Sequence, residues 1–266
     1  MRNFVTMREF VESFVVPLLT GRKSACVCEI GASSGASTSL LASLPNVTVT
    51  VVDPCLDCDL KKKYAGSPQV TVKRGISLEV LPSLQDSFDC ILVDGDHNWY
   101  TVYHELKLIS ERHLLQPGGL IFFHDVEWPY GRRDMYYQPE MIPRTHRHSY
   151  DQKGIVRGQS ELSDRSGFNS ALCNAAHEGG AHNGVLTAIE DFLHDRRVNR
   201  DYRLYCVREG YGLGVMQRSG KLKDDLIFLS LQCKGTSYHI AHWSKRFIKL
   251  HFPRAFSMAK SLLGRT

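Results

Sequence analysis

Hydrophobic and polar residues alternate along this chain with two different periods. Short apolar runs predict β-strands at 27–30, 47–52, 88–94 and 117–125, and residues 70–77 are predicted to form a further strand with its turn. Apolar residues at helical spacing predict helices at 36–44, 77–84, 99–115 and 184–195. Two further apolar runs, 202–208 and 213–217, flank Glu209-Gly210 and predict an antiparallel hairpin. The pattern predicts an α/β protein with a doubly wound sheet of seven strands, parallel except for the C-terminal hairpin, and with helices on both faces.

A glycine turn joins the first predicted strand to the first helix of this pattern. Gly31 and Gly35 lie in the turn, and the second strand ends on Asp53. Glycines let the backbone approach a ligand closely, the helix directs free N–H groups at it, and an acid at Asp53 can bind both hydroxyls of a ribose. The ligand is therefore predicted to be an adenosine-type cofactor. The complete Gly-x-Gly-x-x-Gly fingerprint of dinucleotide sites is missing, which disfavours an NAD-dependent oxidoreductase.

The same segment resembles a known enzyme family. Glu29-x-Gly31-x-x-x-Gly35, followed by Asp53, resembles motifs I and II of class I S-adenosylmethionine-dependent methyltransferases, and the resemblance continues in order through about residues 25–125. It implies a Rossmann-like fold, S-adenosylmethionine as cofactor, and a glycine turn that accommodates the methionine part. The cofactor-binding residues that it implies are Glu29, Gly31, Ser33, Gly35, Asp53, Ile76, Ser77 and Asp94.

Two further turns carry candidate chemistry. Asp94-Gly95-Asp96-His97 follows the fourth strand and His124-Asp125 follows the fifth, so they should be neighbours at one edge of the sheet. The arrangement resembles metal-dependent small-molecule O-methyltransferases, especially the macrocin-type sugar and cephalosporin-tailoring group. This resemblance implies that Asp94 and Asp125 hold a divalent cation (Mg²⁺ or Mn²⁺) and that His97 is the general base, with Asp94 beside it in catalysis.

His124 departs from that family pattern, because the relatives carry two oxygen ligands after strand five. Imidazole is a poor ligand for Mg²⁺ and a good one for Mn²⁺, Fe²⁺ or Zn²⁺. Three alternatives follow: His124 points away and Glu127 or Asp96 supplies an oxygen, His124 joins the metal site and the metal is a softer one, or there is no metal. A non-functional alternative also stands, in which Asp94 caps the helix near Trp99.

About 58 residues separate Asp125 from the helix at 184–195, whereas α/β connections usually take about two to six. We expect residues 126–182 to form an inserted substrate cap. Its segment Trp128–Tyr137 mixes aromatic rings with Arg132 and Arg133, which suits a polyhydroxylated ring. The predicted acceptor is a small molecule, a sugar or glycosylated metabolite. Basic residues of the insertion are offset by eight acids between residues 125 and 178, so no nucleic-acid site is indicated.

Charge separates the chain into two parts. The net charge is +5, but residues 221–266 carry +7 and the remainder −2. We therefore divide the chain into a methyltransferase domain at 1–218 and a basic C-terminal extension at 219–266, which is either a solvated helix or a contact to an anionic surface.

Three features bear on the compartment. Met7–Leu19 is interrupted by charges and by Pro17, so it predicts an amphipathic helix rather than a signal peptide or a membrane span. Of eight cysteines, Cys26, Cys28 and Cys90 lie in predicted buried strands, which favours a reducing, cytoplasmic setting. The lone Cys55-x-x-Cys58 pair has no second pair of ligands and is interpreted as an incidental loop pair. A homo-oligomer and a non-catalytic cofactor-binding module both stay open at this point.

Overall fold

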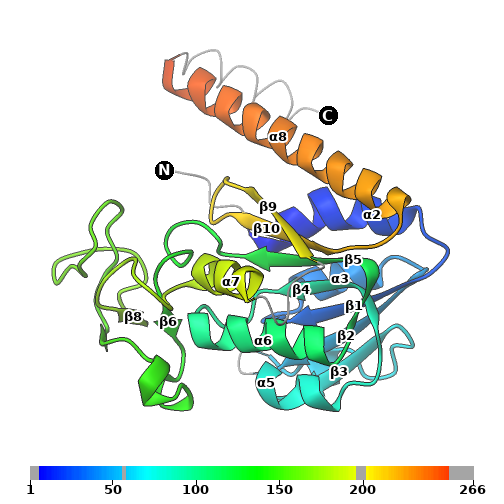
Figure 1. Cartoon of the computed structure of the whole chain (residues 1–266), viewed down its shortest axis with the longest axis horizontal. Coiled ribbons are helices and arrows are strands. Elements are labelled where there is room, and N and C mark those ends of the chain that lie inside the picture. The colour runs from blue at the N-terminus through cyan, green and yellow to red at the C-terminus, as the bar shows by residue number, and fades with distance from the viewer. Residues whose placement is uncertain (1–5, 56–57, 196–201, 252–266) are drawn as a thin grey trace.

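The computed structural model describes residues 6–55, 58–195 and 202–251, with the side chains of Lys223 and of residues 238–251 excepted. A seven-stranded sheet with the order β3-β2-β1-β4-β5-β10-β9 crosses the molecule (Figure 1). Its strands are β1 (Ala25–Ile30), β2 (Val47–Asp53), β3 (Val70–Arg74), β4 (Phe88–Val93), β5 (Leu115–His124), β9 (Tyr202–Val207) and β10 (Leu213–Arg218). The first five are parallel, and β10 runs antiparallel to both β5 and β9. The predicted fold class is confirmed.

Helices cover both faces of this sheet (Figure 1). One face carries α1 (Met7–Phe10), a π-helical turn (Val11–Val15), α2 (Val16–Thr20), α3 (Ala36–Ala42), α4 (Leu60–Lys63) and α8 (Leu222–His251). The other carries α5 (Ser77–Val80) with a 3₁₀ turn (Leu81–Ser83), α6 (Trp99–Glu111) and α7 (Val185–His194). The predicted N-terminal amphipathic helix corresponds to α1, the π-helical turn and α2.

Alternation along each strand divides its side chains between two hydrophobic layers. In β4, Leu92 packs into the layer under α3 and α8, whereas Ile91 and Val93 pack into the layer under α6 and α7. Both faces of these strands are buried, which explains why their sequences are nearly continuous apolar runs. The carboxyl ends of the parallel strands are left for the site.

The helix predicted at 99–115 ends earlier in the structure, at Glu111. His113 has a φ of 54°, in the left-handed region, and this turns the chain out of the helix. Leu115 then becomes the first residue of β5 rather than the last residue of the helix. At the other end, the side chain of Asn98 accepts a hydrogen bond from the backbone N–H of Thr101 and caps α6.

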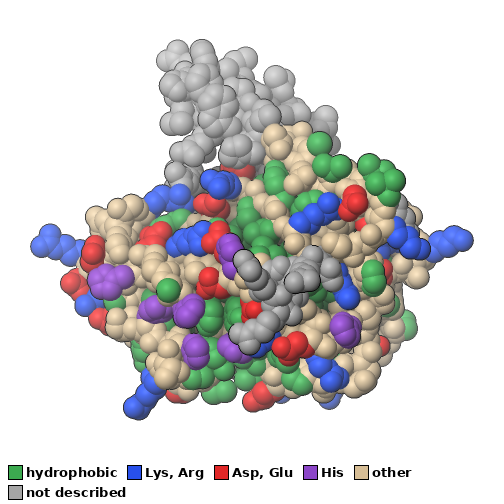
Figure 2. Space-filling model, viewed as in Figure 1, with side chains coloured by type: hydrophobic (Ala, Val, Ile, Leu, Met, Phe, Trp, Pro, Cys, Tyr) green, Lys and Arg blue, Asp and Glu red, His purple; other side chains and the backbone are tan. Residues whose placement is uncertain are grey.

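The insertion at 126–182 folds into a small lobe beside the carboxyl ends of the strands, in green in Figure 1. Three short strands pair in the order β6-β8-β7, with β6 at Met135–Tyr136, β7 at Tyr150–Asp151 and β8 at Cys173–Ala175. Two 3₁₀ turns, Pro139–Met141 and Arg144–His146, lie between β6 and β7. Figure 2 shows histidines on the surface of this side of the molecule, where His146 and His182 pack against Trp99 of α6.

The C-terminal extension is joined to the domain by its first turns. Phe228 and Leu231 of α8 are buried in the layer that covers one face of the sheet. Most of the predicted basic residues, from Lys245 onward, lie outside the described side chains, and so does any contact of them with an anionic surface. Within the described ranges, no helix combines the length and the apolar character that crossing a membrane requires.

Candidate active site

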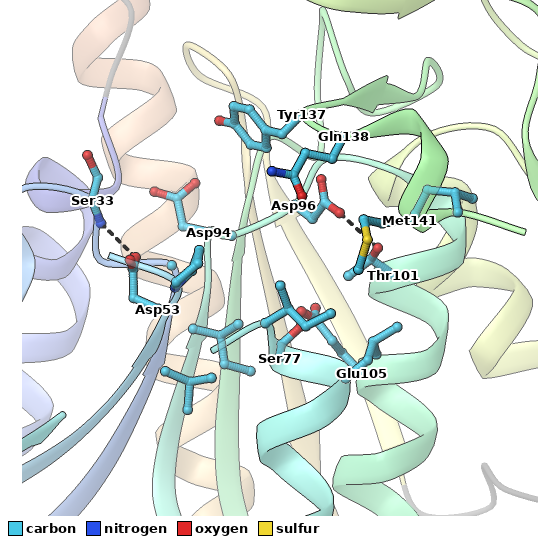
Figure 3. Close-up of a pocket in the computed structure, with 18 residues that line it drawn as sticks. Ser33, Asp53, Ser77, Asp94, Asp96, Thr101, Glu105, Tyr137, Gln138 and Met141 are labelled. Atoms are coloured by element: carbon cyan, nitrogen blue, oxygen red, sulfur yellow. Dashed lines mark hydrogen bonds between the residues drawn. The ribbon is translucent and has the colours of Figure 1, made fainter. Parts of the chain in front are cut away.

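A cavity of about 250 Å³ opens at the carboxyl ends of β1, β2 and β4, where Figure 3 shows it. The strand ends, the segments that follow them and α6 contribute Ile30, Gly31, Ser33, Val52, Asp53, Pro54, Ile76, Ser77, Leu78, Asp94, Gly95, Asp96, Thr101 and Glu105. The inserted lobe contributes Tyr137, Gln138, Met141 and Ile142. Six of the eight residues expected to bind the cofactor therefore line this cavity, and Glu29 and Gly35 do not.

The glycine turn after β1 is shaped by a close approach to the turn after β4. Gly31 has a φ of +80°, and a Cβ atom placed on it would lie 2.3 Å from the Cα of Gly95 and 2.4 Å from the carbonyl oxygen of Asp94. Only glycine tolerates both conditions. Gly35, with a φ of +77°, begins α3 and packs against the side chain of Leu60, so it shapes the helix start rather than the cavity wall.

Asp53 holds the same turn from the end of β2. Its carboxylate accepts hydrogen bonds from the backbone N–H groups of Ala32 (2.7 Å), Ser33 (3.0 Å) and Cys55 (2.5 Å). A carboxylate offers about four acceptor positions, so one is left for a ligand hydroxyl. Asp53 thus organises the turn as well as facing the cavity.

Glu29 lies beneath the turn and is only 3% exposed. Its carboxyl accepts a hydrogen bond of 2.5 Å from the hydroxyl of Thr38 on α3. Burial raises the pKa of Glu29 to about 8, and the Thr38 hydrogen bond opposes that shift. The geometry supports an indirect contribution to the cofactor site, through the packing of α3 on β1.

Two carboxylates and two imidazoles meet at the ends of β4 and β5. The Nε2 atom of His97 lies 2.7 Å from Oδ2 of Asp125 and 3.7 Å from Oδ1 of Asp94. The Nδ1 atom of His124 lies 3.0 Å from the same Asp125 oxygen and 3.2 Å from the same Asp94 oxygen. The sequence-predicted catalytic and metal residues are therefore brought together, and His97, His124 and Asp125 are all buried.

Charge balance dominates the titration of this cluster. Burial disfavours charged imidazole, but the carboxylates of Asp125 and then Asp94 outweigh it and raise the pKa of His97 to about 10. The same two carboxylates raise the pKa of His124 well above its ordinary value. The imidazoles in turn lower the pKa values of both Asp94 and Asp125 against the effect of burial. Two positive and two negative groups therefore neutralise one another in the buried site.

The donor atoms of this cluster fit a divalent cation. One ligand atom each from Asp94, His124 and Asp125 lies within 4.8 Å of the others, the spacing of a three-ligand site. His124 points into the cluster, so the alternative in which it points away is wrong. Glu127 instead faces Arg208, and Asp96 accepts a hydrogen bond from Thr101. Two carboxylates with one imidazole suit Mn²⁺ or Fe²⁺ better than Mg²⁺.

Two arginines of the insertion bind groups of the protein itself rather than facing the cavity. Arg132 pairs with Glu190 of α7, and the fully buried Arg133 donates to the backbone oxygens of Ala175 and Ser160. These groups hold the lobe together, so they do not carry the expected contact to a polyhydroxylated ring. Tyr137 does face the cavity: it is 56% exposed, and its ring lies 6.0 Å from that of His97.

Sequence reasoning missed several residues of the wall, among them Thr101, Glu105 and the inserted segment 137–142. Glu105 could have been found. It lies three residues after Val102 and four before Ile109, on the apolar face of α6, where a carboxyl is unexpected without a partner or a ligand.

Comparison with known proteins finds one matching family model and structures of similar fold. Residues 28–126 match the model of a methyltransferase domain. A methyltransferase from Podospora anserina, solved with bound S-adenosylhomocysteine, shares the fold at 15% identity with a TM-score of 0.50, covering 81% of this chain and 80% of that one. The O-methyltransferase TomG from Streptomyces achromogenes, which is involved in tomaymycin synthesis and was solved with S-adenosylmethionine, is 13% identical with a TM-score of 0.46, covering 81% and 82%. No curated protein matches the chain significantly.

Residues 28–126 therefore match a methyltransferase domain, and the chain shares its fold with a solved methyltransferase that binds S-adenosylhomocysteine. The enzyme class expected from the sequence is thereby confirmed.

Proposed function

We propose that this protein transfers the methyl group of S-adenosylmethionine to a hydroxyl of a small-molecule acceptor, with the help of a divalent cation. One observation carries the proposal. Asp94 lies on the wall of the cofactor cavity and is also a member of the carboxylate–imidazole cluster. A hydroxyl held at the cluster is therefore next to the donor site, as an in-line transfer requires.

The cavity supplies the elements needed to hold the methyl donor. Bound S-adenosylmethionine carries a methyl group on a sulfonium, which makes that carbon electrophilic. Gly31 lets the turn after β1 pack against the turn after β4 on the cavity wall, and Asp53 keeps an acceptor position toward the cavity. Transfer breaks the S–CH₃ bond and forms an O–CH₃ bond, while the electron pair of the broken bond stays on sulfur and leaves S-adenosylhomocysteine.

His97 is the proposed general base. Its Nε2 atom faces Asp125 and Asp94, so it can take the proton of a hydroxyl that enters between them. The charge of these carboxylates raises the pKa of His97 to about 10, and a protonated imidazole cannot act as a base. Neutralisation of the carboxylates would remove that effect.

A divalent cation held by Asp94, His124 and Asp125 would supply this neutralisation. It would also lower the pKa of an alcohol, which is otherwise far above 7. With a cation bound, the neutral imidazole of His97 could therefore act as a base even though two carboxylates lie beside it.

For the acceptor we propose a saccharide hydroxyl. The exposed ring of Tyr137 and the ring of Tyr211, 5.7 Å from that of His124, border the cluster and offer aromatic faces to a sugar. The inserted lobe brings Tyr137 to this position, which supports its role as a substrate cap.

The first experiment is calorimetry of the purified protein with S-adenosylhomocysteine and with NAD. We expect binding of the former only; binding of NAD alone would instead support an oxidoreductase. The second experiment measures transfer of a labelled methyl group from S-adenosylmethionine to a panel of monosaccharides, glycosides, phenols and amines. Transfer only to amines would contradict O-methylation, transfer only to phenols would contradict the saccharide acceptor, and cofactor binding without any transfer would support a non-catalytic module.

The cation is tested by exhaustive chelation followed by re-addition of metals. Turnover should be lost and should return better with Mn²⁺ than with Mg²⁺, because His124 is one of the ligands. Asp125→Asn should lower kcat by about 10²-fold or more with unchanged S-adenosylhomocysteine affinity. Asp86→Asn, at an exposed site before β4, is the matched control. Full activity of the metal-free protein would refute the cation.

A further inference from the structure

Glu105 is an ionisable residue at the end of the cavity that the proposed chemistry does not use. It is 1% exposed and projects from α6 onto the cavity wall. Neither of its carboxylate oxygens makes a hydrogen bond of ordinary geometry within the described residues. A buried carboxyl without partners costs free energy, so its presence on a cavity wall indicates a missing ligand group.

The surroundings of Glu105 indicate what kind of ligand group this is. Ile76 and Leu78 border the cavity from the start of α5, and Met141 and Ile142 border it from the inserted lobe. This end of the cavity therefore combines apolar walls with two carboxyls, of which Asp96 accepts a hydrogen bond from Thr101 and Glu105 has no such partner among the described residues. A flat heteroaromatic ring with a polar edge matches that combination, because its faces can be buried while its edge forms hydrogen bonds.

The arrangement of residues around the cavity agrees with this assignment. Figure 3 shows Ser33 and Asp53 on one side of the cavity and Ser77 and Glu105 on another. The polar glycine turn suits the ribose and the amino-acid part, which leaves the apolar end with Glu105 for the base.

We propose that Glu105 recognises the adenine ring of the cofactor by accepting a hydrogen bond from its exocyclic 6-amino group, with Met141 and Ile142 of the inserted lobe covering the ring. The inference rests on the proposed use of S-adenosylmethionine, and it makes the insertion part of the cofactor site as well as of the acceptor site. A carboxyl oxygen accepts this hydrogen bond in either protonation state. Burial raises the pKa of Glu105 to about 8 against the effect of the nearby Ser77 hydroxyl, so a neutral carboxyl could also donate to an adjacent ring nitrogen.

The test is a binding cycle with two ligands and several protein forms. The ligands are S-adenosylhomocysteine and its purine analogue, in which hydrogen replaces the 6-amino group. The unaltered protein should bind the analogue about tenfold more weakly or worse, because the analogue leaves the buried carboxyl unpaired. Equal affinity of the unaltered protein for the two ligands would overturn the proposal without any substitution.

Glu105→Ala should bring the ratio of the two dissociation constants close to one. Glu105→Gln keeps an acceptor oxygen and should retain most of the preference. If Glu105 had only a structural role, Glu105→Ala would weaken the binding of both ligands by the same factor. The ratio of the two dissociation constants would then stay unchanged, which would also overturn the proposal. Glu111→Ala, an exposed position on the same helix, is the matched control and should change neither constant.

The covering residues are tested with the same ligands. Met141→Ala should weaken the binding of both ligands by a similar factor, because the substitution removes contact with the face of the adenine ring and not with its edge. Failure of the unaltered protein to bind S-adenosylhomocysteine would refute the proposed function, whereas normal binding with no preference for the 6-amino group would refute only the role of Glu105.

Discussion

Glu29 gives a quantitative test of how the cofactor turn is built. The residue is buried under α3, and its pKa is raised from 4.5 to about 8, chiefly by burial. An acid whose pKa is raised by folding destabilises the native state once the pH exceeds the unfolded pKa. That effect grows as the pH rises from 4.5 and levels off above about 8.

The magnitude follows from linkage. Between the unfolded and the folded pKa, each pH unit lowers the free energy of unfolding by about 1.4 kcal/mol. From about pH 5 to pH 7.5 the carboxyl of Glu29 should therefore lower it by about 3 kcal/mol. In Glu29→Gln the amide oxygen can still accept from Thr38, but the side chain no longer titrates. The variant should therefore lack this loss and should gain stability relative to the unaltered protein as the pH rises.

The assay is urea denaturation of both proteins, without cofactor, from pH 5 to pH 8. The difference in unfolding free energy between them should widen by about 1.4 kcal/mol per pH unit in the middle of this range. Other titrating groups, Glu105 included, are common to both proteins and cancel in the difference. Parallel pH profiles would refute the reasoning. Because Glu29 does not line the cavity, the variant should also keep its affinity for S-adenosylhomocysteine, and loss of that affinity would indicate a direct contact.

Other substitutions test the turn, the lobe and the cluster. Gly31→Ala should lower the melting temperature and abolish S-adenosylhomocysteine binding in calorimetry, since the new Cβ would overlap the turn after β4. Asp134→Ala should cost about 3 kcal/mol or more in urea denaturation, because its carboxylate accepts two backbone N–H groups at the starts of α6 and α7 and one tyrosine hydroxyl; the exposed Asp151→Ala should cost far less. In metal-free protein followed by NMR, His97 should stay protonated through neutral pH, and Asp125→Asn should lower its pKa; an unchanged pKa would refute the ion pair.

Much of the fold and part of the site follow from local sequence. Strands buried on both faces require continuous apolar runs, and a turn pressed against its neighbour requires glycine, so β1, Gly31 and the order of the elements are predictable from residues close together in the chain. The cluster at Asp94 and Asp125 is predictable for a related reason: parallel strands that are neighbours in the sheet bring their carboxyl ends together.

Contacts between segments that are far apart in the sequence depend on how the whole chain packs. Glu29 is close to the glycine turn in sequence, yet α3 covers it and removes it from the cavity wall. The direction of His124, which decides whether the cation site is completed by nitrogen, depends on packing at the strand end rather than on any local pattern. Residues 137–142 and Glu105 line one cavity only because the insertion folds back over α6, and no periodicity within either segment encodes that approach.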